Sequence, residues 1–209
     1  MRVADRPEIV ARPAWRTVRP RPAAYIGKPK PLRPATRMPP SSDQTRPAPP
    51  GLLPRLLVAV LPVVAASVGG GLFTAPNIPT WYAGLAKPGF TPPNWVFPVV
   101  WTILYAMMAL AIWRILGRRP ATGPARRSWA LAVAAFFVQL ALNAAWPPVF
   151  FAGHDLLGGL VVVVALLLAV LWTTRLFLSL DRTAGLLLVP YAAWAAYASA
   201  LTAAIWRMN

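Results

Sequence analysis

The sequence contains no cysteine, a single histidine and only five acidic residues among its 209. The lack of cysteine excludes disulfide bonds, thiolate nucleophiles and cysteine-ligated metal sites. The histidine, His154, stands beside Asp155. With no second histidine or cysteine to complete a set of ligands, we expect the two to be a solvated loop pair, and we predict no metal site.

Charge is also scarce, because charged residues make up 12% of the chain and hydrophobic residues 57%. This composition excludes a soluble domain and indicates a membrane protein. Runs of about 20 apolar residues are long enough to cross a hydrocarbon core about 30 Å thick. Five such runs are predicted as helices, at residues 52–73, 95–116, 128–151, 156–178 and 184–206. They are continuously apolar and do not alternate, so the predicted fold is all-α and polytopic, a bundle of five transmembrane helices over residues 51–209.

Residues 1–50 differ from the rest of the chain, since they are rich in proline and arginine and have no apolar period. We expect them to form a disordered tail, with eleven basic residues against three acidic ones. Such a segment could bind anionic lipid headgroups or nucleic acid, but we favour a solvated tail without a nucleic-acid partner. Translation from Met38 would remove most of it.

The arginines predict the orientation of the bundle. Five spans put the tail and the second and fourth connections on one side, where Arg55, Arg114, Arg118, Arg119, Arg126, Arg127, Arg175 and Arg182 lie. The opposite side carries only Lys87 and Arg207. Because basic connections stay in the cytoplasm, we expect an integral protein of the bacterial inner membrane with a cytoplasmic N-terminus.

The stretch WYAGLAKPGFTPPNWVFPVVW, residues 81–101, joins the first two spans. Its four prolines remove backbone donors, so its middle cannot be helical and should form a stiff lid. Its aromatic residues fit two roles equally well, an interfacial belt of helix anchors or the wall of a ligand cavity. Lys87 in this lid is a candidate partner for a ligand carboxylate.

Polar residues inside the spans favour the cavity. Gln139 and Asn143 are one helical turn apart, with Trp146 on the same face. The two amides serve either hydrogen bonds between helices or the anchoring of a ligand. The inward-facing candidates are mostly aromatic: Tyr82, Pro92, Trp101, Tyr105, Asn143, Trp146 and Trp194. They include no carboxylate or imidazole for acid–base catalysis, so we predict a cavity for a flat apolar guest and no catalytic residue.

Four segments carry a resemblance to a known family. These are WYAGLAKPGFTPPNWVFPVVWTILY, QLALNAAWPPVFF, AGLLLVPYAAWA and the terminal IWRMN. In order and spacing they resemble the tryptophan-rich sensory proteins, bacterial relatives of the mitochondrial translocator protein, the peripheral benzodiazepine receptor. The resemblance covers about residues 52–209 and not the tail.

The resemblance implies a five-helix bundle, often a homodimer, whose pocket beneath the first loop binds porphyrins, haem and aromatic drugs. On this basis Tyr82 and Pro92 correspond to lid residues, Trp101 and Tyr105 to the second-helix wall, Asn143 and Trp146 to the third-helix wall, and Trp194 and Ala198 to the fifth. The family's terminal amide is replaced here by Thr202. A proposed cholesterol motif also fails, since Arg207 is too far from Tyr197.

Three functions start from the same bound complex. The leading prediction is a membrane sensor or regulator that binds a tetrapyrrole as ligand and needs no obligatory cofactor. The alternatives are a transporter of porphyrins or related apolar ligands, and light-dependent porphyrin degradation with Trp101 and Trp194 as redox partners of the excited ring.

Overall fold

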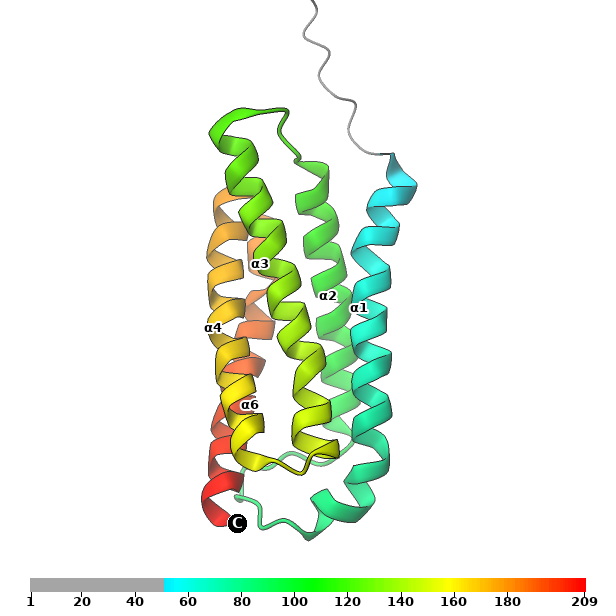
Figure 1. Ribbon diagram of the computed structural model, residues 1–209, viewed down its shortest axis with the longest axis vertical. Helices are drawn as coiled ribbons and strands as arrows, with labels where there is room; N and C mark the ends of the chain where they lie inside the picture. Colours follow the sequence, from blue (N-terminus) through cyan, green and yellow to red (C-terminus); the bar gives the residue numbers. More distant parts are fainter. Residues whose placement is uncertain (1–50) are drawn as a thin grey trace, which may run out of the picture. The chain divides into compact units, whose positions relative to one another are not determined.

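The computed structural model describes residues 51–209, so the predicted tail, residues 1–50, lies outside the described part. The described residues form an all-α bundle, which confirms the predicted fold class (Figure 1). The main helices are α1 (Leu52–Thr74), α2 (Val96–Gly117), α3 (Gly123–Pro147), α4 (Leu156–Leu180), α5 (Arg182–Leu187) and α6 (Val189–Met208). Together they make five candidate membrane spans, as expected for an integral membrane protein.

The ends of three spans differ from the prediction, and prolines explain two of the differences. The first span continues beyond residue 73 to Tyr82, but as a 3₁₀ turn and a π turn. These turns are irregular because Pro76 and Pro79 lack the amide hydrogen that a regular α-helix requires. The last span is two helices, α5 and α6, with the junction at Leu188 just before Pro190. The third span begins at Gly123 and not at residue 128, since its first turn precedes the apolar run.

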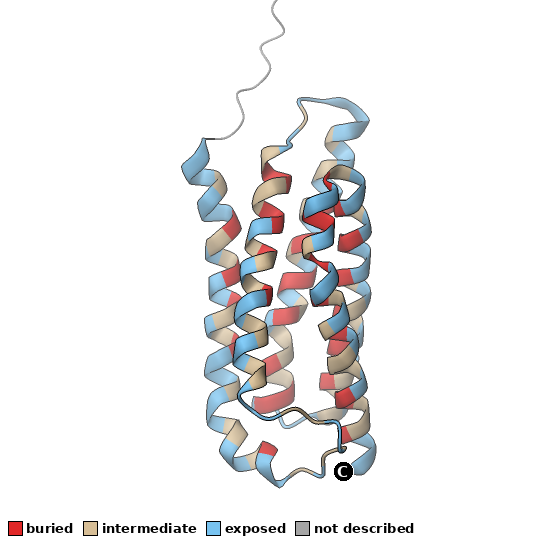
Figure 2. Ribbon diagram, turned by 180° about the vertical axis from the view of Figure 1, so that it is seen from behind, coloured by how far each residue is buried: buried red, intermediate tan, exposed pale blue. Residues whose placement is uncertain are grey.

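Each long helix packs against two or more of the others. α3 lies against α4 and α1, α4 lies against α6, and α2 lies against α1 and α5. Buried side chains face the interior of the bundle, whereas the outer faces are exposed (Figure 2). The exposed side chains are largely apolar, including Leu61, Val68, Ile103, Leu168 and Trp172. An apolar exterior is the surface that a lipid environment requires.

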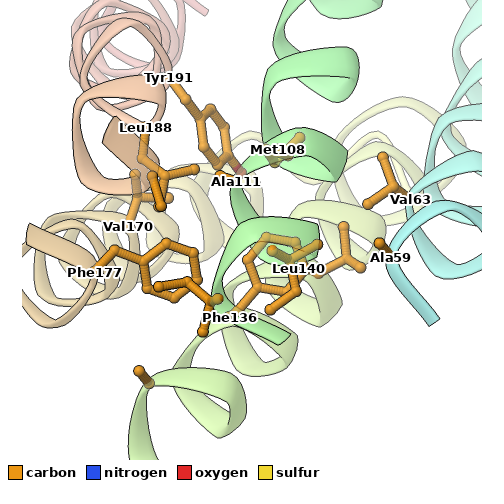
Figure 3. Close-up of a cluster of buried hydrophobic side chains, with 14 of the residues drawn as sticks. Ala59, Val63, Met108, Ala111, Phe136, Leu140, Val170, Phe177, Leu188 and Tyr191 are labelled. Atoms are coloured by element: carbon orange, nitrogen blue, oxygen red, sulfur yellow. The ribbon is translucent and has the colours of Figure 1, made fainter. Parts of the chain in front are cut away.

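The main core occupies one half of the bundle's length. Met108 and Ile112 of α2, Phe136 of α3, Phe177 of α4 and Tyr191 of α6 have no exposed surface (Figure 3). Phe136 and Phe177 are stacked, with ring centroids 6.0 Å apart and planes inclined by 16°. A second, smaller cluster lies nearer to the connection between α1 and α2 and contains Tyr82, Phe150, Phe151, Leu201 and Ile205. A cavity lies along this second half.

Candidate ligand cavity

The cavity has a volume of about 380 Å³, within the range of roughly 300–1,000 Å³ that small-molecule sites occupy. Residues from α1, α2, α3, α4 and α6 line it, together with Asn94 from the predicted lid. Nine of its 27 lining residues are aromatic: Tyr82, Phe97, Trp101, Tyr105, Trp146, Phe150, Phe151, Trp194 and Tyr197. No lining residue is acidic or basic.

Asn143 supplies the polar centre of this wall. Its side-chain oxygen accepts a hydrogen bond of 2.7 Å from the Tyr105 hydroxyl, and its nitrogen donates one of 2.9 Å to the Tyr191 hydroxyl. The amide therefore links α3 to α2 and to α6. It also lines the cavity, so the two roles considered for it, joining helices and facing a guest, are compatible at this position.

The third-helix wall depends on a glycine outside the cavity. The Trp146 indole N–H donates to the backbone carbonyl of Gly159 over 3.1 Å, and the Trp146 ring stacks on Phe150 at 5.0 Å. A Cβ atom at Gly159 would lie 2.6 Å from the Phe150 ring, closer than real Cβ contacts allow. Close approach of α4 to the π turn at Pro148–Ala152 thus fixes both rings.

Trp194 differs from Trp146 in its hydrogen bonding. Its indole nitrogen is buried and has no hydrogen-bond partner. The ring contacts other rings instead, Phe97 at 5.9 Å and Tyr197 at 5.3 Å between centroids. A buried donor without an acceptor costs free energy, and a guest that offered an acceptor would recover it.

The lid contributes Asn94 to the cavity wall. Residues 85–95 are not helical, as the prolines predicted. Asn209 accepts a hydrogen bond from the Ala86 amide and donates one to the Ala86 carbonyl, each 3.0 Å long, and the Tyr197 hydroxyl donates to the Phe90 carbonyl over 2.9 Å. These bonds fasten the lid to α6.

Lys87, the sequence's candidate for a ligand carboxylate, does not line the cavity. Its ammonium group donates to the carbonyls of Tyr82, Ala83 and Leu85, at 2.6, 3.2 and 2.8 Å. Since an ammonium has three donors, these bonds use them all. Lys87 therefore completes the end of the helical turn that precedes the lid.

His154 and Asp155 are both exposed, as expected for a solvated loop, but each contacts a different partner. The imidazole of His154 stacks on Trp81 at 4.5 Å and lies 3.1 Å from the Asn77 side-chain oxygen. The carboxylate of Asp155 instead caps α4 by accepting the Gly158 amide hydrogen over 2.8 Å. Each residue has its own structural role, and His154 adopts a positive φ of 53° in the turn.

Of the nine residues predicted for the site, seven line the cavity: Tyr82, Trp101, Tyr105, Asn143, Trp146, Trp194 and Ala198. Pro92 lies half-buried in the lid and does not line it. Gln139 is fully buried one helical turn before Asn143 in α3. Its side-chain nitrogen lies 4.0 Å from the Met108 sulfur, and its side-chain oxygen has no hydrogen-bond partner. Placement in the wall is a geometric result, and ligand binding by these residues stays a prediction.

Other lining residues escaped the sequence analysis. Phe97 and Phe150 are ordinary apolar residues of spans, and Gly70 brings α1 close enough for a Cβ there to lie 3.3 Å from Pro147. Phe97 lies four residues before Trp101, so the helical period could have found it. Gly70 gives no such signal, because two further glycines adjoin it.

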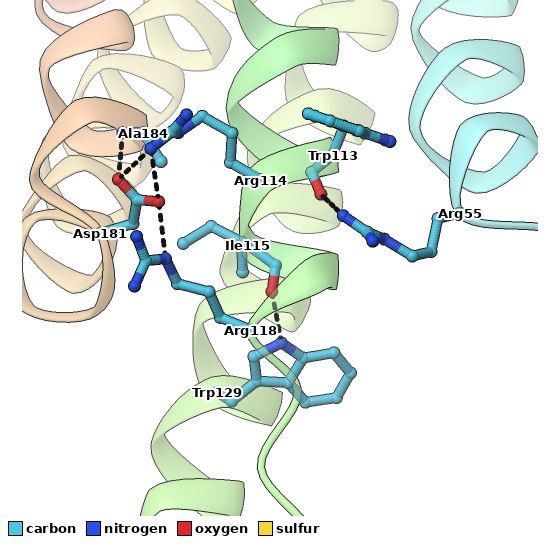
Figure 4. A network of polar contacts seen from close by, with 8 residues as sticks. All are labelled: Arg55, Trp113, Arg114, Ile115, Arg118, Trp129, Asp181 and Ala184. Carbon is cyan, nitrogen blue, oxygen red and sulfur yellow. Dashed lines mark hydrogen bonds and ion pairs between the residues drawn. The ribbon is translucent and has the colours of Figure 1, made fainter. Parts of the chain in front are cut away.

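The opposite end of the bundle is held by ion pairs between side chains. The Asp181 carboxylate accepts hydrogen bonds from Arg118 at 2.7 Å and Arg114 at 3.2 Å (Figure 4). It also caps α5 through the Ala184 amide, 3.1 Å away. Burial alone would raise the pKa of Asp181, but these hydrogen bonds outweigh it and hold the pKa at about 2, below the ordinary 3.8.

Arg55 and Trp129 bond α1 and α3 to α2 at this end. Arg55 donates to the Trp113 carbonyl over 3.2 Å, and the Trp129 indole donates to the Ile115 carbonyl over 2.8 Å (Figure 4). Both acceptors belong to the last turns of α2. Hydrogen bonds and ion pairs thus link the helices at the arginine-rich end, and the cavity lies toward the other end.

Comparison with known proteins agrees with this architecture. The model of the TspO/MBR family matches residues 58–207, which is most of the chain and includes every cavity-lining residue. The chain belongs to the TspO/MBR family. The resemblance read from the sequence motifs is thereby confirmed.

Curated relatives of this TspO/MBR chain come from bacteria, archaea and animals. Protein CrtK of Rhodobacter capsulatus is 41% identical over 73% of this chain and 92% of its own length. Tryptophan-rich protein TspO of Archaeoglobus fulgidus is 39% identical over 74% of this chain and 97% of its own length. The human translocator protein is 36% identical over 62% of this chain and 75% of its own length.

Proposed function

We propose that the cavity binds a tetrapyrrole such as a porphyrin or haem, and that the protein acts as a membrane sensor or regulator of that ligand. The observation that carries the proposal is the composition of the wall. Aromatic rings from α2, α3 and α6 and from the π turns at Ile78–Tyr82 and Pro148–Ala152 line a space that no charged side chain enters. Rings of this kind favour flat π systems, because offset and edge-to-face contacts add about 0.5 to 1.5 kcal/mol per pair beyond burial.

The few polar atoms fit the edge of such a guest. The unpartnered indole N–H of Trp194 is available to an acceptor on the ligand. Asn143 and Tyr105 already bond to each other, so they present a fixed polar patch. The cavity contains no lysine or arginine for a propionate, which favours contact of the ligand's acidic groups with Asn94 and the lid.

Binding by the predicted residues can be tested with three tryptophan variants. We expect Trp101→Ala and Trp194→Ala each to weaken porphyrin binding by about tenfold or more, equivalent to about 1.4 kcal/mol. Trp172→Ala is the matched control, because Trp172 is on α4, is 53% exposed and does not line the cavity. Binding is measured by quenching of tryptophan fluorescence, with folding checked by circular dichroism. Equal affinity for the three folded variants would refute the pocket.

Transport and light-dependent degradation are the alternative functions. The name of the human relative, translocator protein, suggests transport. The presence of Trp101 and Trp194 in one cavity suggests degradation. Purified protein with porphyrin under light separates them: loss of the Soret band indicates degradation. Vectorial movement of porphyrin into sealed vesicles indicates transport, and a sensor shows neither.

Location and assembly are part of the same proposal. We place the chain in the bacterial inner membrane with its N-terminus in the cytoplasm, because eight arginines lie in or beside the connections at one end. We also propose a homodimer, since Ala196 and Ala200 are exposed on α6 and allow close approach of a second helix.

A further inference from the structure

A second hollow lies on the outside of the bundle, between α2 and α6. We call it the lateral groove. It has a volume of about 400 Å³ and is lined by Val100, Ile103, Leu104, Met107, Pro190, Ala193, Trp194 and Tyr197. Trp194 and Tyr197 also line the internal cavity, so these two side chains form the wall between the cavity and the lipid-facing surface.

This wall is made of side chains and not of packed backbone. α2 packs on α1 and α5, and α6 packs on α4, but α2 and α6 do not pack closely together. In the described part of the chain no side-chain hydrogen bond joins α2 directly to α6; the link between them passes through Asn143 of α3. Separating the two helices at the groove therefore breaks no direct polar bond.

Trp194 is the side chain in this wall that can move at least cost. Its indole N–H has no partner, so a change of rotamer breaks no hydrogen bond. Trp146 and Trp129 are different, because each donates to a backbone carbonyl, of Gly159 and Ile115 respectively. Breaking such a bond in an apolar environment leaves two unsatisfied groups.

The route through the lid is the more firmly closed of the two. Asn209 makes two hydrogen bonds to Ala86, and Tyr197 makes one to Phe90. Lys87 fixes the start of the lid through three carbonyls. Entry from the aqueous side would have to break several of these bonds. A flat apolar compound also concentrates in the bilayer and not in water, which brings it to the groove.

We infer that the lateral groove is the entrance to the cavity for ligands dissolved in the bilayer, and that Trp194 is its gate. The ligand class is an apolar ring compound, which moves from the hydrocarbon region between α2 and α6 past the swung indole. Once inside, an acceptor on the ligand can bond to the Trp194 N–H and hold the gate closed. This inference rests on the proposed function, but it concerns the path of binding and not the affinity.

Filling the groove tests the inference without altering the cavity. Ala193 lines the groove but not the cavity, so Ala193→Phe should obstruct entry and leave the bound state unchanged. We expect porphyrin association with the full chain in lipid nanodiscs to slow by about tenfold or more, a barrier increase of about 1.4 kcal/mol. The equilibrium Kd should stay as in the unmodified protein. Association is followed by stopped-flow quenching of tryptophan fluorescence.

The control is Ala141→Phe, the same change at an exposed position of α3 that lines neither the groove nor the cavity, which should leave the rate unchanged. An unchanged rate in folded Ala193→Phe, or an equal slowing in both variants, would overturn the portal. No porphyrin binding by the unmodified protein would instead refute the proposed function.

A reversible cross-link gives an independent test, including the case in which Ala193→Phe does not fold. The chain has no cysteine, so Ile103→Cys with Ala193→Cys places the only two thiols on opposite sides of the groove. Bridging them with a cleavable bifunctional thiol reagent should slow association, and cleavage of the bridge should restore it. An equal rate before and after cleavage, with the bridge verified by mass spectrometry, would contradict a gate between α2 and α6.

Discussion

The side-chain nitrogen of Asn143 donates a hydrogen bond of 2.9 Å to the hydroxyl of Tyr191, a residue with no exposed surface. This contact joins the C-terminal part of α3 to the first turn of α6. Within an apolar bundle such a bond has no water to replace it. It therefore makes the amide a structural part of the cavity as well as a possible ligand contact.

Removing the amide should destabilise the bundle. Asn143→Leu loses the bonds to both Tyr105 and Tyr191, so we expect the free energy of unfolding to fall by about 1 to 3 kcal/mol. Tyr191→Phe should have a smaller effect, because Asn143 keeps its bond to Tyr105. Unfolding in mild detergent measures both. Ser179→Ala is a control, as its hydroxyl bonds only within α4 at an exposed position; an Asn143→Leu protein as stable as this control would contradict the structural role.

A side chain at residue 159 should disturb the cavity from outside. In Gly159→Ala the new Cβ would meet the Phe150 ring at 2.6 Å, so we expect a loss of about 1 to 3 kcal/mol in unfolding free energy and weaker porphyrin binding. Gly69→Ala provides the comparison, because nothing lies within 4 Å of a Cβ there and the change in a helix interior should stabilise by up to about 1 kcal/mol. Similar behaviour of both variants would show that the α4 contact is not restrictive.

The Asp181 cluster should make stability fall in acid. The folded pKa of about 2 lies below the ordinary 3.8, so the carboxylate stabilises the folded state above pH about 4. That contribution, about 2 kcal/mol, is lost as the pH falls from about 4 to 2. Unfolding measured across this range should show the slope in the unmodified protein and in Asp155→Asn, but not in Asp181→Asn. A slope that persists in Asp181→Asn would assign it to another group.

The orientation can be checked with reporters. A reporter after Asn209 should behave as periplasmic and one inserted near Gly123 as cytoplasmic, because positive connections stay inside. In the structure these two positions lie at opposite ends of the bundle (Figure 1). The reverse pattern of reporter activity would invert the proposed topology.

The alanines of α6 should mediate the dimer. Ala192, Ala196, Ala200 and Ala204 recur every four residues, and Ala196 is exposed. Ala196→Leu should therefore weaken the dimer while leaving the bundle folded, as measured by cross-linking and circular dichroism in detergent. Dimers that resist this change would place the interface elsewhere, and misfolding would show that the stripe packs within the bundle.

The sequence predicted the helices well because long apolar runs in lipid have one regular solution, with every backbone group bonded within its own segment. Their ends were harder, since Pro76, Pro79 and Pro190 replace regular turns with 3₁₀ and π geometry or divide the span without stopping it. Aromatic and amide residues on inward faces located the cavity, since seven of the nine predicted residues line it, but they are a minority of the residues in its wall.

The details that the sequence could not supply have a common physical cause. Gln139 and Asn143 share one face of α3, but the partners of each depend on what α2 and α6 place opposite at that depth, which spacing on a single helix does not specify. Lys87 was suggested as a partner for a ligand carboxylate from its charge alone. The carbonyls to which it donates are brought near it by the shape of the turn.

The packing of Gly159 against Phe150 has a consequence for how ligand preference could change in such a protein. The orientation of two aromatic rings in the wall is set by a residue without a side chain on a neighbouring helix, which never touches a guest. Mutational screens restricted to positions that touch the ligand would miss it. Selectivity could then diverge between homologues with the same lining residues, through changes in how closely two helices approach behind the wall.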